Sequence, residues 1–318
     1  MTDKNTVLEK KFISAVVYLR NDAGRIESFA DKLTEFLSSN FVDYEIIFAN
    51  DASTDDSIPV IKSLCVRDSR MRAVSIVQMG HFQGQESAMN AGRDLAIGDF
   101  VYEFDDMLMD YDRDLMLQVY HKALEGYDIV SAGCSNAISV SSRIFYHYYN
   151  RLSASEKDIS SETFRILSRR AINKVKMIDQ YIPYRKAIYM NCGLESAFLT
   201  YESGDAGLRK KMMKGRHERS ALAVDSLIYF TNAMEKLSIW ICVLFAIVAL
   251  AVGADIIYET AAFTHPVEGW RSTMGFLSIG FFGVFLVLAI ILRYLSVLVN
   301  LVFKKTRYLI AGIDKVTS

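Results

Sequence analysis

The N-terminal part of the chain alternates short apolar runs with longer stretches in which apolar residues recur every three or four positions. From Ile26 to Leu37 the spacing i, i+3, i+4, i+7 indicates an amphipathic helix. Short apolar and aromatic runs are typical of buried strands; they are Phe12–Leu19, Glu45–Ala49, Ala73–Val77, Phe100–Phe104 and Tyr127–Ala132. Strands that alternate with helices predict an α/β fold with a doubly wound, parallel sheet.

Three further helices are expected between these strands. One begins near Ser57 and carries Pro59 in its first turn, where the missing N–H costs nothing. The others are expected over Glu86–Ile97 and Asp112–Leu124, and Asp112 is expected to cap the second of them.

Polar side chains follow three of the predicted strands at the point where each strand ends. They are Asn21-Asp22, Asn50-Asp51 and Asp105-Asp106. The carboxyl ends of parallel strands meet at one edge of a sheet, where ligands bind in such folds. Asn and Asp also favour ordinary turns, but three pairs together favour a binding crevice. Clustered Asp oxygens suit Mg²⁺ or Mn²⁺, so we expect such a metal at Asp105 and Asp106.

Two uncharged stretches near the C-terminus predict a transmembrane hairpin. Leu237–Ala254 and Met274–Leu292 are each long enough to cross a hydrocarbon layer of about 30 Å. One such run could be the buried helix of a soluble protein, but two in succession favour membrane spans. Basic residues flank the pair on its outer sides, whereas Asp255–Thr273 between them is acidic, which places both termini in the cytoplasm. The chain beyond Arg293 is expected to continue as a helix.

Composition excludes several other classes of protein. The net charge of −1 gives no basic footprint, so we expect no nucleic acid partner. Four isolated cysteines argue against a zinc site or a disulfide framework. Neither the dinucleotide fingerprint G-x-G-x-x-G after the first strand nor the P-loop motif occurs.

Several segments together resemble glycosyltransferase family 2, and within it the polyprenyl-phosphate glycosyltransferase branch. The quoted segments are VVYLRND, Asn50-Asp51-Ala52-Ser53-Thr54-Asp55, the loop His81–Ala88 with one residue inserted, Gly98-Asp99-Phe100-Val101, Ser142–Tyr146 with Asn150–Leu152, and Phe164–Arg170. The resemblance implies a GT-A nucleotide-diphospho-sugar transferase domain followed by two transmembrane helices. It also implies transfer of a sugar from a UDP- or GDP-sugar to a polyprenyl phosphate.

The resemblance also implies roles for individual residues. The residues implied to bind the nucleotide are Asn21, Asp22, Asn50, Asp51, Ser53 and Asp105. Those implied to act in catalysis are Asp105, Asp106 and Glu162, and those implied to bind the metal are Asp105 and Asp106. Arg143 and Arg165 would hold the phosphate of the acceptor lipid, since arginine suits bidentate binding of phosphate. A solvated basic face near anionic lipid is the other interpretation of these arginines.

The chain departs from the family pattern in ways that keep a second hypothesis open. The Asp-x-Asp motif falls on Asp105-Asp106-Met107, and the acid expected before Phe-Arg falls on Thr163, with Glu162 one position away. The alternative to a membrane-bound transferase is therefore a catalytically degenerate or partner-dependent GT-A protein that acts as a binding module. A transferase with a glycan or protein acceptor is a third, less favoured hypothesis.

The predicted organisation has four parts. A cytosolic GT-A domain spans residues 1–219, an interfacial amphipathic helix 220–236, the transmembrane hairpin 237–303, and a cytosolic tail 304–318. The resemblance places the protein in the bacterial inner membrane with its catalytic domain in the cytosol. The oligomeric state stays open, a homo-oligomer included.

Overall fold

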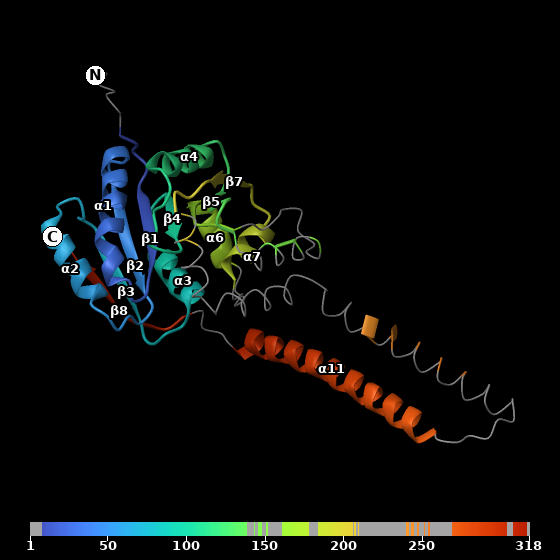
Figure 1. The fold of residues 1–318 in the computed structure, drawn as a ribbon. Helices are drawn as coiled ribbons and strands as arrows, with labels where there is room; N and C mark the ends of the chain where they lie inside the picture. The colour runs from blue at the N-terminus through green and yellow to red at the C-terminus, as the bar shows by residue number, and fades with distance from the viewer. Residues whose placement is uncertain are drawn as a thin grey trace. The chain divides into compact units, whose positions relative to one another are not determined.

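In the computed structural model, the N-terminal half of the chain forms alternating strands and helices (Figure 1). The structure describes residues 8–138, 143, 146, 147, 151, 161–177, 184–205, 207, 209, 240, 241, 243, 244, 247, 251, 254, 269–303 and 308–316. The first elements are β1 (Ile13–Leu19), α1 (Ala23–Asn40), β2 (Tyr44–Asn50), α2 (Ser57–Arg67), β3 (Val74–Met79), α3 (Gln85–Leu95), β4 (Phe100–Phe104), α4 (Arg113–Leu124) and β5 (Ile129–Cys134). The predicted strands and helices of this half are confirmed, with shifts of one or two residues at most ends.

Two local features of these helices also agree with the prediction. Asp112 caps α4, because its Oδ1 accepts a hydrogen bond from the backbone N–H of Asp114 at 3.2 Å. Pro59 lies in the first turn of α2.

The sheet is mixed: the predicted parallel arrangement is confirmed for β1, β2, β3 and β4, but two further strands run antiparallel to their neighbours. Its order is β7-β5-β6-β4-β1-β2-β3-β8, and it includes β6 (Phe164–Ser168), β7 (Ser196–Tyr201) and β8 (Ile310–Val316). β6 runs antiparallel to both β4 and β5, and β8 runs antiparallel to β3. None of these three strands was expected from the sequence.

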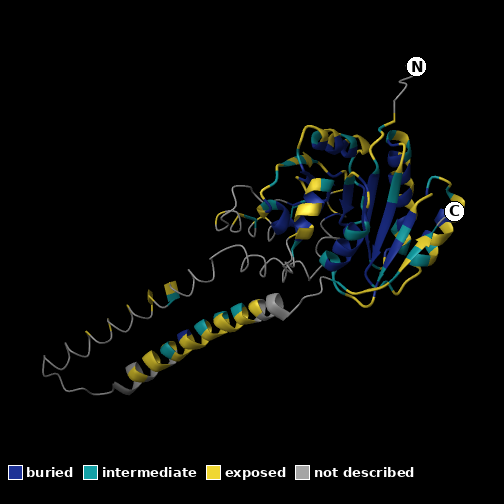
Figure 2. Cartoon of the chain, turned by 180° about the vertical axis from the view of Figure 1, so that it is seen from behind, coloured by how far each residue is buried: buried dark blue, intermediate teal, exposed yellow. Residues whose placement is uncertain are grey.

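Helices cover the sheet on both faces, and each face has its own hydrophobic cluster. α1, α2 and α4 pack on one face, where Phe29, Phe36, Tyr102 and Phe104 lie among the buried side chains. α3, α6 (Arg169–Met177) and α7 (Arg185–Asn191) supply the cluster of the other face, which includes Val16. Each fully buried aliphatic or aromatic side chain stabilises the fold by about 1.5–3 kcal/mol, and Figure 2 shows the sheet buried between these layers.

Successive side chains of β4 alternate between the two faces. Tyr102 and Phe104 belong to the cluster beneath α1, whereas Val101 belongs to the cluster beneath α3. Glu103 therefore projects toward the same face as Val101, where it is fully buried. A carboxylate at this depth requires partners of opposite charge, and these partners form the site described below.

The C-terminal segment corrects one prediction. The helix α11 (Gly269–Phe303) extends past Arg293 as expected, but residues 310–316 then form β8 instead of more helix. The segment Lys305–Ser318 belongs to the same compact unit as the sheet, and Val224–Lys304 belongs to a second unit.

One helix among the described residues is long and apolar enough to cross a membrane. It is the part Gly275–Leu295 of α11, and it overlaps the predicted span Met274–Leu292. Most of its described side chains are exposed (Figure 2). The predicted first span, Leu237–Ala254, lies mostly outside the described residues, and the predicted interfacial helix 220–236 lies wholly outside them.

Candidate active site

The carboxyl ends of β1 and β2 are joined by hydrogen bonds between their loops. The backbone N–H of Asn21 donates to Ser53 Oγ at 3.1 Å, and the N–H of Thr54 donates to Asn21 Oδ1 at 2.8 Å. Asp22 N–H donates to Ser57 Oγ at 3.1 Å. Since β4, β1 and β2 are parallel neighbours, the predicted polar pairs lie at one edge of the sheet.

Asp51 is buried at this edge and accepts hydrogen bonds on both oxygens. Tyr18 donates its hydroxyl to Oδ2 at 3.1 Å, and the backbone N–H of Gln83 donates to Oδ1 at 2.8 Å. Asn50 is held beside it, since its Nδ2 donates to Gln78 Oε1 at 2.6 Å. The backbone of Ala52 is left-handed, with φ of 52°. Such a conformation is uncommon for a residue with a Cβ and is found at functional turns.

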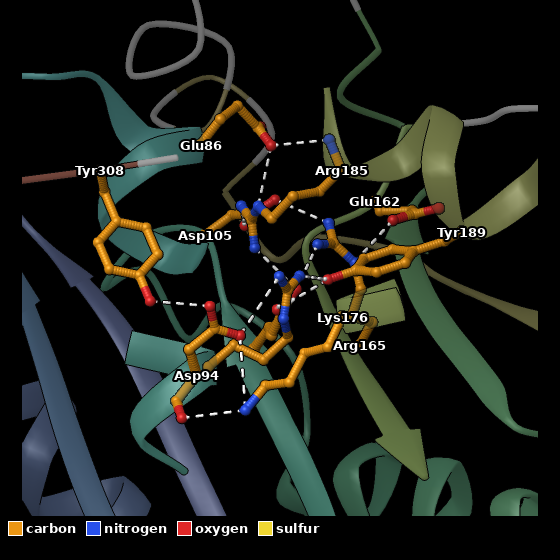
Figure 3. A network of polar contacts seen from close by, with 11 residues as sticks. Glu86, Asp94, Asp105, Glu162, Arg165, Lys176, Arg185, Tyr189 and Tyr308 are labelled. Atoms are coloured by element: carbon orange, nitrogen blue, oxygen red, sulfur yellow. Dashed lines mark hydrogen bonds and ion pairs between the residues drawn. The ribbon is translucent and has the colours of Figure 1, made fainter. Parts of the chain in front are cut away.

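Asp105, the first residue after β4, is buried with each carboxylate oxygen on a different arginine (Figure 3). Arg165 donates from Nη2 to Oδ2 at 2.9 Å, and Arg185 donates from Nη2 to Oδ1 at 2.8 Å. Arg165 lies on β6, which is the antiparallel neighbour of β4, and Arg185 begins α7. A strand and a helix that are distant in sequence therefore fix the Asp105 carboxylate.

Glu103 lies beneath Asp105 and binds the same two arginines. Its Oε2 accepts from Arg165 Nη1 at 2.8 Å and from Arg185 Nη1 at 2.7 Å. Its Oε1 accepts from the hydroxyl of Tyr189 at 2.9 Å, and that hydroxyl accepts from Arg93 Nη1 at 2.7 Å. Glu103, Arg165, Arg185 and Tyr189 thus all have partners in this layer, which is the condition for burying polar groups.

Two further carboxylates bind the arginines of the network. Arg165 donates from Nε to Glu162 Oε2 at 3.0 Å. Arg185 donates both its backbone N–H and its Nε to Glu86 Oε2, each at 2.9 Å. One carboxylate cannot accept hydrogen bonds from all five N–H donors of a guanidinium. Arg165 and Arg185 therefore each bind three carboxylates.

The arginines set the ionisation of the buried acids. Burial alone would raise the pKa of Asp105, but the positive charges of Arg165 and Arg185 outweigh it and hold that pKa well below its usual range. Burial likewise opposes ionisation of Glu103, and Arg185, Arg165 and Arg93 lower its pKa in spite of it. Both carboxylates are therefore charged at physiological pH.

The carboxylates in this arrangement do not fit a divalent cation. Both oxygens of Asp105 carry guanidinium donors. Asp106 Oδ1 accepts the backbone N–H of Leu108 at 3.0 Å, and Met107 is buried in the hydrophobic cluster. No group of three or more His, Cys, Asp or Glu within the described part of the chain is placed as metal ligands would be. The role of Asp105 and Asp106 as ligands of Mg²⁺ or Mn²⁺ stays a prediction from the sequence, which this pairing does not support.

A second polar cluster lies around Asp110. Arg209 donates from Nε to Asp110 Oδ2 at 2.6 Å, and Tyr201 donates its hydroxyl to Oδ1 at 3.0 Å. Thr163, which stands where the family pattern has an acid, has its Oγ1 3.0 Å from the Tyr201 hydroxyl. Burial alone would raise the pKa of Asp110, but the hydrogen bonds from Arg209 and Ser203 hold it below its usual value.

The two predicted acceptor-phosphate residues have different surroundings. Arg143 is exposed, whereas the side chain of Arg165 is 1% exposed and lies among Asp105, Glu103 and Glu162. The structure thus brings Asp105, Glu162 and Arg165 together in one network. The phosphate-binding role of both arginines stays a prediction.

Several residues of the site were not singled out from the sequence. They are Tyr18, Gln83, Arg93, Glu103, Arg185 and Tyr189. Glu103 offered a signal, because a carboxylate in the middle of the apolar run FVYEF needs a buried cation. The sequence offered no comparable signal for Arg185, whose partners lie on α3 and β4.

Comparison with known proteins decides the family. The model of glycosyl transferase family 2 matches residues 14–192, which is more than half of the chain. The chain belongs to glycosyl transferase family 2. The match covers β1 through α7 and therefore includes every residue of the Asp105 network, and the protein is a glycosyltransferase.

The similarity to curated relatives covers more of the chain than the family model does. A bactoprenol glucosyl transferase of Shigella phage SfV is 27% identical over 275 residues, which are 82% of this chain and 86% of that protein. A prophage bactoprenol glucosyl transferase homolog of Escherichia coli (strain K12) is 26% identical over 269 residues, 82% of this chain and 86% of that one. These similarities are consistent with the polyprenyl-phosphate branch.

A solved mannosyltransferase from Pyrobaculum calidifontis, in complex with GDP-Man and Mn²⁺, has a TM-score of 0.48 and a sequence identity of 14% relative to this chain. The comparison covers 90% of this chain and 88% of that one.

Proposed function

We propose that this glycosyltransferase moves a sugar from a nucleoside diphosphate sugar to a polyprenyl phosphate at the cytoplasmic face of a membrane. The observation that carries the proposal is the meeting of the ends of β1, β2 and β4, with Asn21, Asp51 and Asp105, at one sheet edge. The names of the bactoprenol glucosyl transferases, similar over 82% of this chain, support the lipid acceptor.

In this proposal the nucleotide lies along the ends of β1 and β2. Asn50, Asp51 and Ser53 present polar atoms that are already oriented by hydrogen bonds to Gln78, Tyr18 and Asn21. Oriented groups lose less entropy when a ligand binds, so this edge is suited to hold a base and ribose in one position.

The transfer step breaks the bond between the anomeric carbon and the diphosphate and forms one to an oxygen of the lipid phosphate. A phosphate monoester is already an anion near neutral pH, so the acceptor does not need a strong base. Glu162 is committed to Arg165 by a bond of 3.0 Å. We therefore propose that Glu162 and Arg165 position Asp105, and that the exposed Arg143 binds the lipid phosphate.

The topology of the sheet supports a membrane hairpin. β8 follows α11 in the chain and is hydrogen-bonded to β3, so residues on both sides of α11 lie in one folded unit. A unit cannot lie on both sides of a membrane. If Gly275–Leu295 of α11 crosses, a second crossing must lie between Arg209 and Gly269, where Leu237–Ala254 is uncharged.

A second candidate function is a nucleotide-binding module without turnover. The pairing of Asp105 with Arg165 and Arg185 favours this second function, because each carboxylate oxygen of Asp105 already accepts a hydrogen bond from an arginine. The two candidates are separated by incubating the detergent-solubilised protein with UDP- and GDP-sugars, with and without undecaprenyl phosphate. Nucleotide release that depends on the lipid supports the transferase; nucleotide binding without release supports the module.

A further inference from the structure

The segment that follows α11 contacts the loop that leads to the proposed nucleotide site. We call residues 308–316 the tail and residues 80–84 the β3–α3 loop. The tail forms β8 along β3, with Met79 opposite Ile310. The loop begins where this pairing ends, and the backbone N–H of Gly80 donates to the carbonyl of Leu309 at 3.0 Å.

Gln83 makes the closest connection between the loop and the tail. Its Nε2 donates to the carbonyl oxygen of Leu309 at 2.7 Å, and the N–H of Leu309 donates to its Oε1 at 2.8 Å. The side-chain amide of Gln83 thus forms two reciprocal hydrogen bonds with the backbone of Leu309, as a residue of a neighbouring strand would. A reciprocal pair of this kind fixes the orientation of the amide as well as its position.

The backbone of the same residue points the other way. Its N–H donates to Asp51 Oδ1 at 2.8 Å, and Asp51 lies at the end of β2 among the residues proposed to hold the nucleotide. Beside Gln83, the centroid of the Phe82 ring lies 3.9 Å from the guanidinium carbon of Arg20. Arg20 also donates from Nη1 to the carbonyl oxygen of Ala52 at 3.2 Å. Gln83 therefore links the tail directly to the loop that carries Asp51.

A second contact ties the tail to the network around Asp105. The hydroxyl of Tyr308 donates to Asp94 Oδ2 at 2.8 Å, and Asp94 also lies 3.7 Å from the ammonium of Lys176 (Figure 3). Asp94 follows Arg93, whose guanidinium binds Tyr189 inside the network. The tail thus contacts Gln83, which binds Asp51, and Asp94, which adjoins Arg93 in the chain.

Gln83 directly precedes Gly84 at the end of the loop. Gly84 follows it with a left-handed backbone, φ of 87°, which turns the chain into α3.

We propose that Gln83 is a positioning residue of the nucleotide site and that Leu309 of the tail holds it in place. Without this support the loop would sample other conformations, as surface loops do, and Asp51 would lose a donor. The consequence is a weaker affinity for the nucleotide, by about tenfold for the loss of two neutral hydrogen bonds. This inference rests on the proposed function, since it assumes that a nucleotide binds beside Asp51.

The test compares the wild-type chain with four variants in detergent by titration calorimetry with UDP and with GDP. The variants are Gln83→Ala, Gln83→Glu, a chain truncated after Arg307, and the truncated chain with Gln83→Ala. Asp314→Asn is the matched control, because it removes an exposed ion pair of 3.0 Å between the tail and Lys62, far along β8 from the loop. Hydrogen exchange of the Gly80 and Gln83 amides is followed in the same samples.

We expect Gln83→Ala and the truncation each to weaken nucleotide binding by about tenfold, with no further loss when they are combined. We expect Gln83→Glu to fall between wild type and Gln83→Ala, and Asp314→Asn to bind as wild type does. The amides of Gly80 and Gln83 should exchange faster in the truncated chain. If Gln83 and the tail had a merely structural role, their losses of nucleotide affinity would add in the combined variant. These losses would also be proportional to the fall in unfolding temperature.

Two outcomes would overturn the inference, and they are distinguishable. If wild type binds UDP or GDP and Gln83→Ala binds it equally well, the positioning role is wrong and the proposed function stands. If wild type binds neither nucleotide at millimolar concentration, the proposed function is wrong and the inference falls with it.

Discussion

Arg185 and Asp105 are joined by a hydrogen bond of 2.8 Å between Nη2 and Oδ1, with the Arg185 side chain 1% exposed and that of Asp105 8% exposed. Because Arg165 takes the other oxygen, the carboxylate at the end of β4 is enclosed by two cations. The arrangement makes Asp105 the counter-ion of two arginines. From the sequence alone, Asp105 was expected to bind a metal.

The first prediction concerns the stability of this network. Asp105→Ala leaves the adjoining cations of Arg165 and Arg185 without one of their carboxylates, and we expect a loss of about 3 kcal/mol in the free energy of unfolding. Asp106→Ala is the control, since Asp106 accepts one backbone hydrogen bond and lies 3.7 Å from Arg209; we expect it to cost about 1 kcal/mol. Denaturant unfolding in detergent measures both, and equal losses would contradict the pairing.

The second prediction concerns pH. The folded-state pKa of Asp105 is depressed, so its pairing stabilises the protein above the ordinary aspartate pKa and is lost only as pH falls toward the folded value. The difference in unfolding temperature between wild type and Asp105→Asn should stay constant from about pH 8 to 5 and narrow below about pH 4. A difference that already closes between pH 7 and 5 would show that Asp105 is not held by the arginines.

The third prediction tests how closely α3 packs on the sheet. A Cβ at Gly92 would lie 2.6 Å from Val16 Cγ1 and 3.3 Å from the Cβ of Ala49, whereas a Cβ at Gly24 meets nothing within 4 Å. Gly92→Ala should destabilise the fold by about 1–3 kcal/mol because the fully buried Val16 side chain must shift in a packed core. Gly24→Ala, also in a helix, should be neutral or stabilise by up to about 1 kcal/mol. Equal unfolding temperatures for the two variants would contradict this packing.

The strands that the sequence predicted are those whose pattern is local. Phe12–Leu19 and Phe100–Phe104 are apolar runs bounded by turns, and their burial follows from composition alone. Phe164–Ser168 was missed because Arg165 interrupts it, and a buried arginine is recognisable only when Glu103 and Asp105 are seen beside it. Ile310–Val316 was missed because its sheet partner among the described strands, β3, is distant in the sequence.

The site was predicted in the same partial way. Turn-forming Asn and Asp after the strands marked the edge, and parallel topology brought them together. The sequence could not show that Asp105 faces arginines, because Arg165 and Arg185 are 60 and 80 residues away along the chain. Contacts at such separations depend on the strand order, which includes two antiparallel strands that the periodicity did not reveal.

The fourth prediction concerns membrane topology. A reporter fused after Ser318 should lie on the same side as one fused to the N-terminus, since β8 and β3 share a sheet. A reporter inserted between Asp255 and Glu268 should lie on the opposite side if two spans form a hairpin. Green fluorescent protein and alkaline phosphatase fusions in a bacterial host measure this. Termini on opposite sides would be incompatible with β8 in the sheet, and an inserted reporter on the cytoplasmic side would remove the hairpin.

The measurement that tests the account most directly is the transfer of labelled sugar into the organic-soluble fraction by the purified full-length protein. Undecaprenyl phosphate, a panel of UDP- and GDP-sugars, and either Mn²⁺ or a chelator would be supplied, with Asp51→Ala as the inactive control. We predict lipid-linked sugar from at least one donor. Because both oxygens of Asp105 bind arginines, we expect the chelator not to change the amount of this product. Donor binding without any lipid-linked product would contradict the proposed transfer, and product that the chelator abolishes would contradict the arrangement of Asp105 described here.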